Sequence, residues 1–195
     1  PPFAKDLVAY GVVFAAEESV PDAFMENVGQ TIAEMFRVGD DSDTQLQDAI
    51  LTDLYRYEAL LPVPRTERSL DRLVDEQDEL WEEISSTHSV CDIIMSSVPQ
   101  GQVMEVVEHI LHAVTDVGLH HTFPEAWGLN RHSELWRAMQ TAIGAGFYDV
   151  SSYDDFRGAP PEVFDRVLMQ EFAYWFLTTA WDLQVPYGPD ESEWT

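Results

Sequence analysis

The stretch EVVEHILHAVTDVGLHH, residues 105–121, holds four of the chain's six histidines, interspersed with three carboxylates. An advance of about 100° per residue gathers the valines, Ile110 and Leu111 on one arc, and the histidines and carboxylates on the other. An apolar arc of this kind is typical of a helix packed on a core. The stretch therefore predicts a helix over about 102–117, with Gly118 as its stop signal.

The polar arc of this helix brings together side chains that can bind metal. Residues three or four positions apart on a helix lie close enough to reach one ion. Four pairs have this spacing: Glu108–His112, His109–His112, Glu105–His109 and His112–Asp116. Imidazole and carboxylate groups suit zinc and related metals. The alternative is an ordinary solvated face in an acidic chain. The helix alone leaves both alternatives open.

The rest of the chain predicts an α+β fold that is predominantly helical. Short apolar runs predict a small sheet, with strands at 7–16, 57–64 and 89–98. Helical spacing and capping residues, including Asp43 as a candidate cap, predict further helices at 21–37, 44–54, 66–84, 133–145 and 160–182. The connections are predicted as a loop at 119–131, an irregular segment at 148–161 and an extended tail from 186. No linker divides the chain, so residues 1–195 are predicted to form a single domain.

The composition excludes several classes of partner. The chain has 36 acidic and 10 basic residues, for a net charge of −26. Such a surface repels the phosphates of nucleic acids and the headgroups of anionic membranes. No apolar run approaches the roughly 20 residues that span a bilayer. We therefore expect no nucleic-acid partner and no membrane insertion.

The acidic excess also suggests a hypothesis about the surroundings in which the protein works. A net charge of −26 is tolerated where salt screens self-repulsion, as in a high-salt or marine environment. Secreted or periplasmic, acidic surroundings, and carboxylates that gather divalent cations, are alternatives; the compartment and the oligomeric state stay open. The high-salt hypothesis predicts a melting temperature that rises steeply with added salt, and a thermal melt with a flat salt response would contradict it.

Two further motifs give the chain a resemblance to a known class of enzymes. EHILHAVTDVG (108–118) aligns with H-E-x-x-H, so that Glu108 takes the place of the first histidine, His109 that of the general base and His112 that of the second histidine. The downstream QEFAYW (170–175) has a helical glutamate where Glu-zincins place their third ligand. The chain is similar to zincin-like metallopeptidases. It resembles in particular uncharacterised bacterial and marine proteins that share E-E-x-x-H, a glycine six residues later, E-[FY]-x-Y-W and a closing E-W.

The resemblance implies a zincin-like single domain with an active-site helix and a metal-dependent, peptidase-like hydrolase function. It implies Zn²⁺, or another divalent metal, on Glu108, His112 and Glu171, with His109 near the base position and a peptide or protein as substrate. Tyr174, one turn after Glu171, would stabilise an oxyanion or serve as a core aromatic. By chemistry alone, His109 and His112 can bind the metal and leave Glu108 as the base. The alternative function is a non-catalytic acidic binding or structural protein with a degenerate zincin site.

Overall fold

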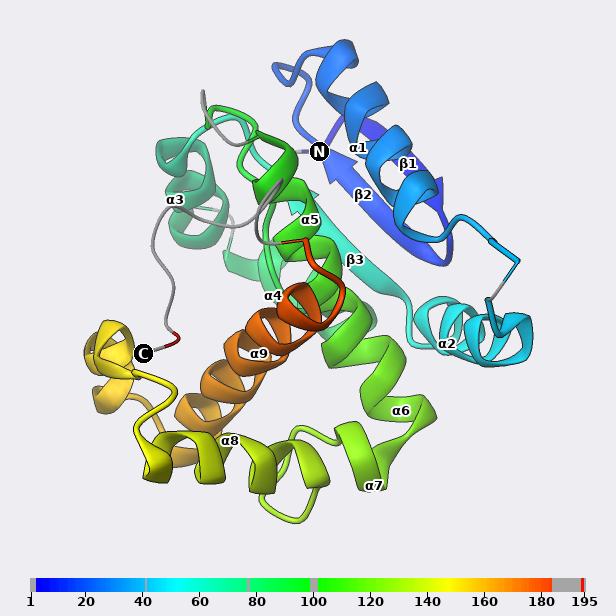
Figure 1. The fold of residues 1–195 in the computed structure, drawn as a ribbon. Coiled ribbons are helices and arrows are strands. Elements are labelled where there is room, and N and C mark those ends of the chain that lie inside the picture. Colours follow the sequence, from blue (N-terminus) through cyan, green and yellow to red (C-terminus); the bar gives the residue numbers. More distant parts are fainter. Residues whose placement is uncertain (1–2, 41, 77, 99–101, 184–193, 195) are drawn as a thin grey trace. The chain divides into compact units, whose positions relative to one another are not determined.

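The computed structural model is α+β and mainly helical, which confirms the predicted fold class at this level (Figure 1). It describes residues 3–40, 42–76, 78–98, 102–183 and 194. The chain divides into two compact units, Pro1–Gly118 and Leu119–Thr195. The prediction of one domain over 1–195 stays a prediction.

A four-stranded sheet organises the first unit, in the order β1-β2-β3-β4. The first pair of strands is antiparallel, and the other two pairs are parallel. The strands are β1 (Lys5–Ala9), β2 (Val12–Ala16), β3 (Ala59–Val63) and β4 (Ser89–Val90). Figure 1 shows the first three strands side by side. Parallel neighbours require crossover connections, and two pairs of helices supply them.

The crossover helices confirm most of the predicted helices of the first unit. They are α1 (Asp22–Met35) and α2 (Thr44–Arg56) between β2 and β3, and α3 (Glu67–Glu76) and α4 (Asp78–Thr87) between β3 and β4. The side chain of Asp43 caps α2 by accepting from the N–H groups of Gln45 and Leu46 at 3.1 Å, as predicted. Helix is found on both sides of residue 77, as α3 and α4, so the helix predicted over 66–84 is confirmed for the described residues.

The single strand predicted over 7–16 is wrong, because this stretch forms a hairpin of two strands. Tyr10 and Gly11 turn the chain with φ angles of 51° and 80°, as is typical of the tight turns that match the twist of a hairpin. A Cβ on Gly11 would lie 2.8 Å from the carbonyl oxygen of Leu51. The turn therefore requires glycine for both its backbone angle and its packing, although the apolar run around it resembles one buried strand.

The predicted strand 89–98 is shortened to two residues as β4. Continuing the β3–β4 register would set Pro62 opposite Asp92, and proline has no N–H to donate to a neighbouring strand. The chain nevertheless stays beside β3, because the N–H of Ile94 donates to the carbonyl of Pro62 at 3.0 Å. Asp92 therefore lies where the ladder is interrupted.

The helix predicted over 102–117 is present as α5 (Gln102–Ala113), which contacts α1 and β3. The prediction that Gly118 stops it is wrong, since this residue lies inside the π-helix η1 (Val114–Leu119). A Cβ on Gly118 would lie 2.7 Å from Cγ2 of Ile50 on α2. The glycine allows close packing rather than ending the helix. Fully buried apolar side chains around the sheet form the core of this unit, among them Phe14, Ile32, Leu54, Leu61 and Ile110.

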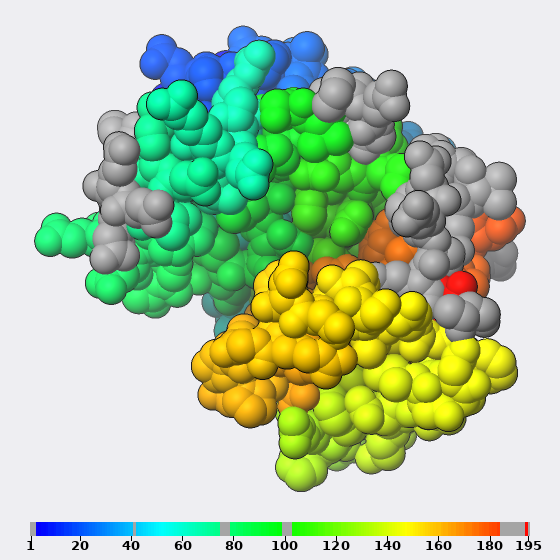
Figure 2. Space-filling model, turned by 90° about the vertical axis from the view of Figure 1, so that its left-hand side faces the viewer, coloured from blue at the N-terminus to red at the C-terminus, as the bar shows by residue number. Residues whose placement is uncertain are grey.

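The second unit is built from helices. They are α6 (His120–Thr122), α7 (Pro124–Trp127), α8 (Glu134–Ala145), the 3₁₀ helix η2 (Ser151–Gly158) and α9 (Pro161–Ala180). The helices predicted at 133–145 and 160–182 are confirmed. The predicted loop 119–131 instead contains α6 and α7, and the predicted irregular segment contains η2, whose exposed residues are yellow in Figure 2.

The C-terminal tail lies outside the described residues except for Trp194, which forms an antiparallel bridge with Tyr148 in the second unit. Within the described residues, no helix combines the length and the apolar character needed to cross a bilayer.

Candidate metal centre

The polar arc of the helix that runs through α5 into η1 is largely withdrawn from water. The exposed fraction is 1% for His112 and 3% for Asp116, and 15% for the side chain of His109. Charged and imidazole side chains are rarely buried unless they are paired or bind an ion. The alternative of an ordinary solvated face is therefore wrong for this part of the helix.

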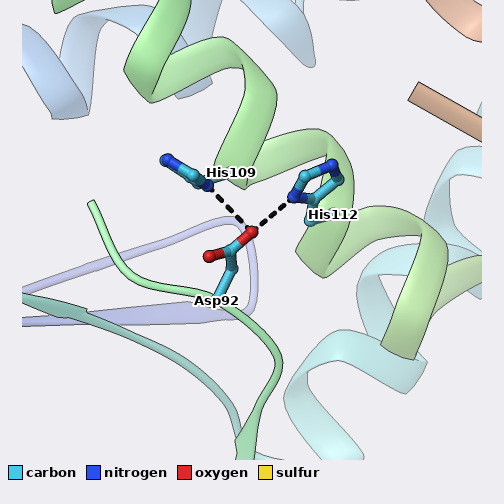
Figure 3. A group of neighbouring side chains, drawn as sticks. All are labelled: Asp92, His109 and His112. Atoms are coloured by element: carbon cyan, nitrogen blue, oxygen red, sulfur yellow. Dashed lines mark hydrogen bonds and ion pairs between the residues drawn. The ribbon is translucent and has the colours of Figure 1, made fainter. Parts of the chain in front are cut away.

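Asp92 joins the two histidines of α5. Its Oδ2 atom lies 2.9 Å from Nδ1 of His109 and forms a hydrogen bond with Nδ1 of His112 (Figure 3). Its other oxygen accepts the N–H of Ile93 at 2.8 Å. The interruption of the ladder opposite Pro62 lets this carboxylate leave the sheet and reach the helix. One oxygen atom thus faces both imidazole rings.

Glu105 holds the opposite side of the His109 ring. Its Oε1 atom lies 3.2 Å from Nε2 of His109, one helical turn away. The same oxygen accepts the N–H of Met95 at 2.7 Å. His109 therefore has a carboxylate at each ring nitrogen, and Glu105 is itself fixed to the segment that carries Asp92.

The charges within this cluster stabilise one another. Burial opposes the ionisation of Asp92, but its hydrogen bonds with His109 and His112 hold the pKa of this carboxyl group well below its usual range. Burial likewise opposes the charging of His109, but its hydrogen bonds with Asp92 and Glu105 raise the pKa of the imidazole to about 10. In the structure as it stands, the cluster is an imidazolium between carboxylates.

Glu108 is a separate carboxylate on the same helix, four positions before His112. Burial raises its pKa, and the nearby charges of His112 and His109 only partly offset this effect. A carboxyl group with a raised pKa is a better proton acceptor than an ordinary surface carboxylate. Glu108 therefore has the chemistry of a general base beside the cluster.

The donor set fits a transition metal ion. Asp92, His109 and His112 each offer a ligand atom, and these atoms lie within 4.8 Å of one another. Zinc bonds of about 2.0–2.1 Å in tetrahedral geometry hold ligand atoms about 3.4 Å apart. The carboxylate would have to withdraw from His109 by about half an ångström to admit the ion. A metal would also replace the proton on each Nδ1, since only the neutral ring binds metal.

The structure brings three of the predicted site residues, Glu108, His109 and His112, into one region of the first unit. Glu171 and Tyr174 lie on α9 in the second unit, where Glu171 is half-buried and Tyr174 is buried. The assignments of Glu171 as a ligand and of Tyr174 to the oxyanion stay predictions.

Sequence reasoning missed Asp92, and it paired Glu105 with His109 by helical spacing as two side chains that can reach one ion. The signal available for Asp92 was a single carboxylate inside the apolar run VCDIIM, just before the helix. An acidic residue in an otherwise buried strand needs a partner, and the histidines of the next helix are candidates for it.

Comparisons with known proteins do not assign a role to this cluster. No protein-family model, curated protein or solved structure matches the chain. Its function therefore has to be inferred from its own chemistry, namely two buried imidazoles that share one carboxylate oxygen, with two further carboxylates on the same helix.

Proposed function

We propose that the protein is a zincin-like, metal-dependent hydrolase that binds Zn²⁺ or a similar divalent metal through Asp92, His109 and His112. One observation carries the proposal: Nδ1 of both histidines faces the same carboxylate oxygen in a site largely removed from water. Two imidazoles and a carboxylate are a common ligand set of catalytic zinc sites, which keep a further position open for water.

Glu105 supports this choice of ligands. Where a histidine binds metal through one nitrogen, its other N–H usually donates to a carboxylate that fixes the ring. With Nδ1 of His109 on the metal, Nε2 can donate to Oε1 of Glu105 at 3.2 Å. The cluster thus favours the alternative in which both histidines bind and Glu108 is free, over the alternative in which Glu108 is a ligand and His109 is the base.

The remaining residues then have separate roles in hydrolysis. A metal held by Asp92, His109 and His112 would supply a bound water of lowered pKa and would polarise a carbonyl group. Glu108, whose pKa is raised by burial, accepts the proton of the water and passes it to the leaving group. Glu105 would hold the His109 ring in place through its Nε2 atom, while Asp92 would be the third ligand. A peptide or protein substrate follows from the resemblance to metallopeptidases.

A second candidate function is a non-catalytic protein in which the same cluster only stabilises the fold. The observation that favours it is the set of ion pairs that Asp92 and Glu105 already form with His109. A buried network that is satisfied by its own partners fixes two segments against each other without an ion.

Metal content separates the two functions. We expect the purified, untagged protein to retain close to one equivalent of zinc or another transition metal after dialysis against a weak chelator, as measured by elemental mass spectrometry. The reason is that three donors converge, of which His112 is buried and Asp92 and His109 are partly buried. No retained metal, and no uptake after zinc is added, would contradict the hydrolase and favour the structural network.

Glu108→Gln then tests the assignment of the base. This variant is expected to keep its metal and to lose hydrolysis of a mixed peptide library by about 100-fold or more, the usual contribution of a general base. Loss of the metal from Glu108→Gln would instead support Glu108 as a ligand. Glu171→Gln tests the remaining predicted ligand by the same measurement of metal content.

A further inference from the structure

A cavity in the second unit has an aromatic lining that the proposed hydrolase does not use. It encloses about 470 Å³, including its open mouth, and lies between α7, α8 and α9. Its lining comprises Ala126, Trp127, Glu134, Leu135, Ala138, Phe172 and Phe176. All of these residues belong to the same unit, so the cavity is complete within it.

Three aromatic rings form the wall of the cavity. The ring centroids of Trp127 and Phe176 lie 6.2 Å apart with planes inclined at 61°, and those of Phe172 and Phe176 lie 6.3 Å apart at 27°. At these separations the rings contact one another, so a ligand can meet only the sides that line the cavity. The faces carry partial negative charge and attract cations within about 6 Å, most strongly for tryptophan.

Small side chains keep the space beside these rings open. Alanine occupies positions 126 and 138, where a larger side chain would fill the cavity. Phe176 is 46% exposed, although it is a large apolar residue. The ring of Phe176 is therefore reachable from solvent and that of Trp127 is partly so, whereas Phe172 is buried, at 3% exposure.

The lining of the cavity includes one carboxylate, that of Glu134. The side chain of Glu134 is 72% exposed, and its contact with Arg137 is long, at 3.7 Å between two exposed groups. An exposed ion pair of this kind contributes little to stability, so Glu134 remains available to a ligand. The net charge of −26 adds a field that draws cations toward the surface and repels anions.

We propose that this cavity binds a small alkylated ammonium cation, with its alkyl groups against Trp127 and Phe176 and its charge facing Glu134. Aromatic faces together with a carboxylate are the usual means of binding such cations. A neutral molecule of the same shape gains only the apolar contact. The inference does not depend on the metal centre and holds whether or not the protein is a hydrolase.

Choline and its neutral isostere 3,3-dimethylbutan-1-ol are the matched probes. The signal of the Trp127 indole N–H, identified in a nitrogen–proton correlation spectrum with Trp127→Phe, reports binding at the site. We expect choline to shift it saturably and the alcohol to bind about tenfold more weakly. Equal affinity for the two probes would show a merely apolar cavity and overturn the proposal, as would the absence of saturable shifts with choline.

Two variants test separately the charge of Glu134 and the open space of the cavity. Glu134→Gln is expected to weaken choline binding about threefold to tenfold and to leave the alcohol unchanged. Ala138→Leu, at an exposed position of α8, fills the cavity without removing a ring or a charge, and it is expected to abolish binding of both probes. Choline binding that survives Ala138→Leu would place the cation elsewhere and overturn the assignment.

Discussion

Replacing His112 by glutamine is expected to lower the zinc affinity at least 100-fold, and the loss follows directly from the geometry. His112 is 1% exposed, and its Nδ1 atom shares the Asp92 oxygen with His109. Loss of one of three ligands should exceed the roughly 10- to 100-fold effect of removing a residue that only orients a ligand. Competition with a chromophoric chelator measures the affinity.

His88→Gln is the matched control for this substitution. His88 lies in the same unit, and its Nδ1 atom contacts the hydroxyl of Thr87 at the surface, so its loss should leave the affinity unchanged. His109→Gln provides a second ligand variant at a less buried position if His112→Gln fails to fold. If circular dichroism shows native structure and both ligand variants keep their zinc, the proposed ligand set is excluded.

Gly11→Ala is expected to reduce the free energy of unfolding by about 2–4 kcal/mol. The φ angle of +80° is costly for any residue with a Cβ. The added atom would also lie 2.8 Å from a backbone oxygen of α2 and 3.0 Å from the backbone nitrogen of Tyr55. Backbone atoms cannot rotate away, so the hairpin and α2 would have to separate. Urea denaturation measures the loss.

Gly39→Ala is the control in the same unit, since its Cβ would meet only the hydroxyl of Ser42 at an ordinary 3.7 Å. It should change the free energy of unfolding by less than about 1 kcal/mol. Equal effects of the two substitutions would mean that the turn at Gly11 tolerates a side chain, contrary to the packing described above.

The sequence alone was enough to predict those elements that depend on residues close together in the chain. The core stripe of α1, with Phe24, Val28 and Ile32 buried, and the capping carboxylate of Asp43 could be predicted because both depend on neighbours within a turn or two. The hairpin around Gly11 could not, because its turn lacks the usual asparagine or aspartate and the residues on both sides of the turn are apolar. Its glycine is required by α2, which is distant in sequence.

The same division applies to the metal centre. The helix and the pairing of His109 with His112 follow from residue spacing, and they were predicted. The contribution of Asp92 depends on Pro62, which lies 30 residues earlier and interrupts the strand ladder at that point. Gly118 was misread for a similar reason: its role is to accommodate Ile50 on another helix, which no local pattern reveals. Contacts between distant segments determine which residues meet at the site. Helical periodicity determines only the helix on which the two histidines lie.

The short last strand has a consequence for how copies of the protein meet one another. Open sheet edges offer unpaired backbone groups that can recruit a second chain and start aggregation. At one edge, β4 ends after two residues, and the chain beyond it turns its Asp92 carboxylate toward α5. At the other edge, β1 carries the charged residues Lys5 and Asp6. The early end of β4, which lets Asp92 reach the candidate metal centre, thus also leaves little of the sheet for edge-to-edge stacking at high protein concentration.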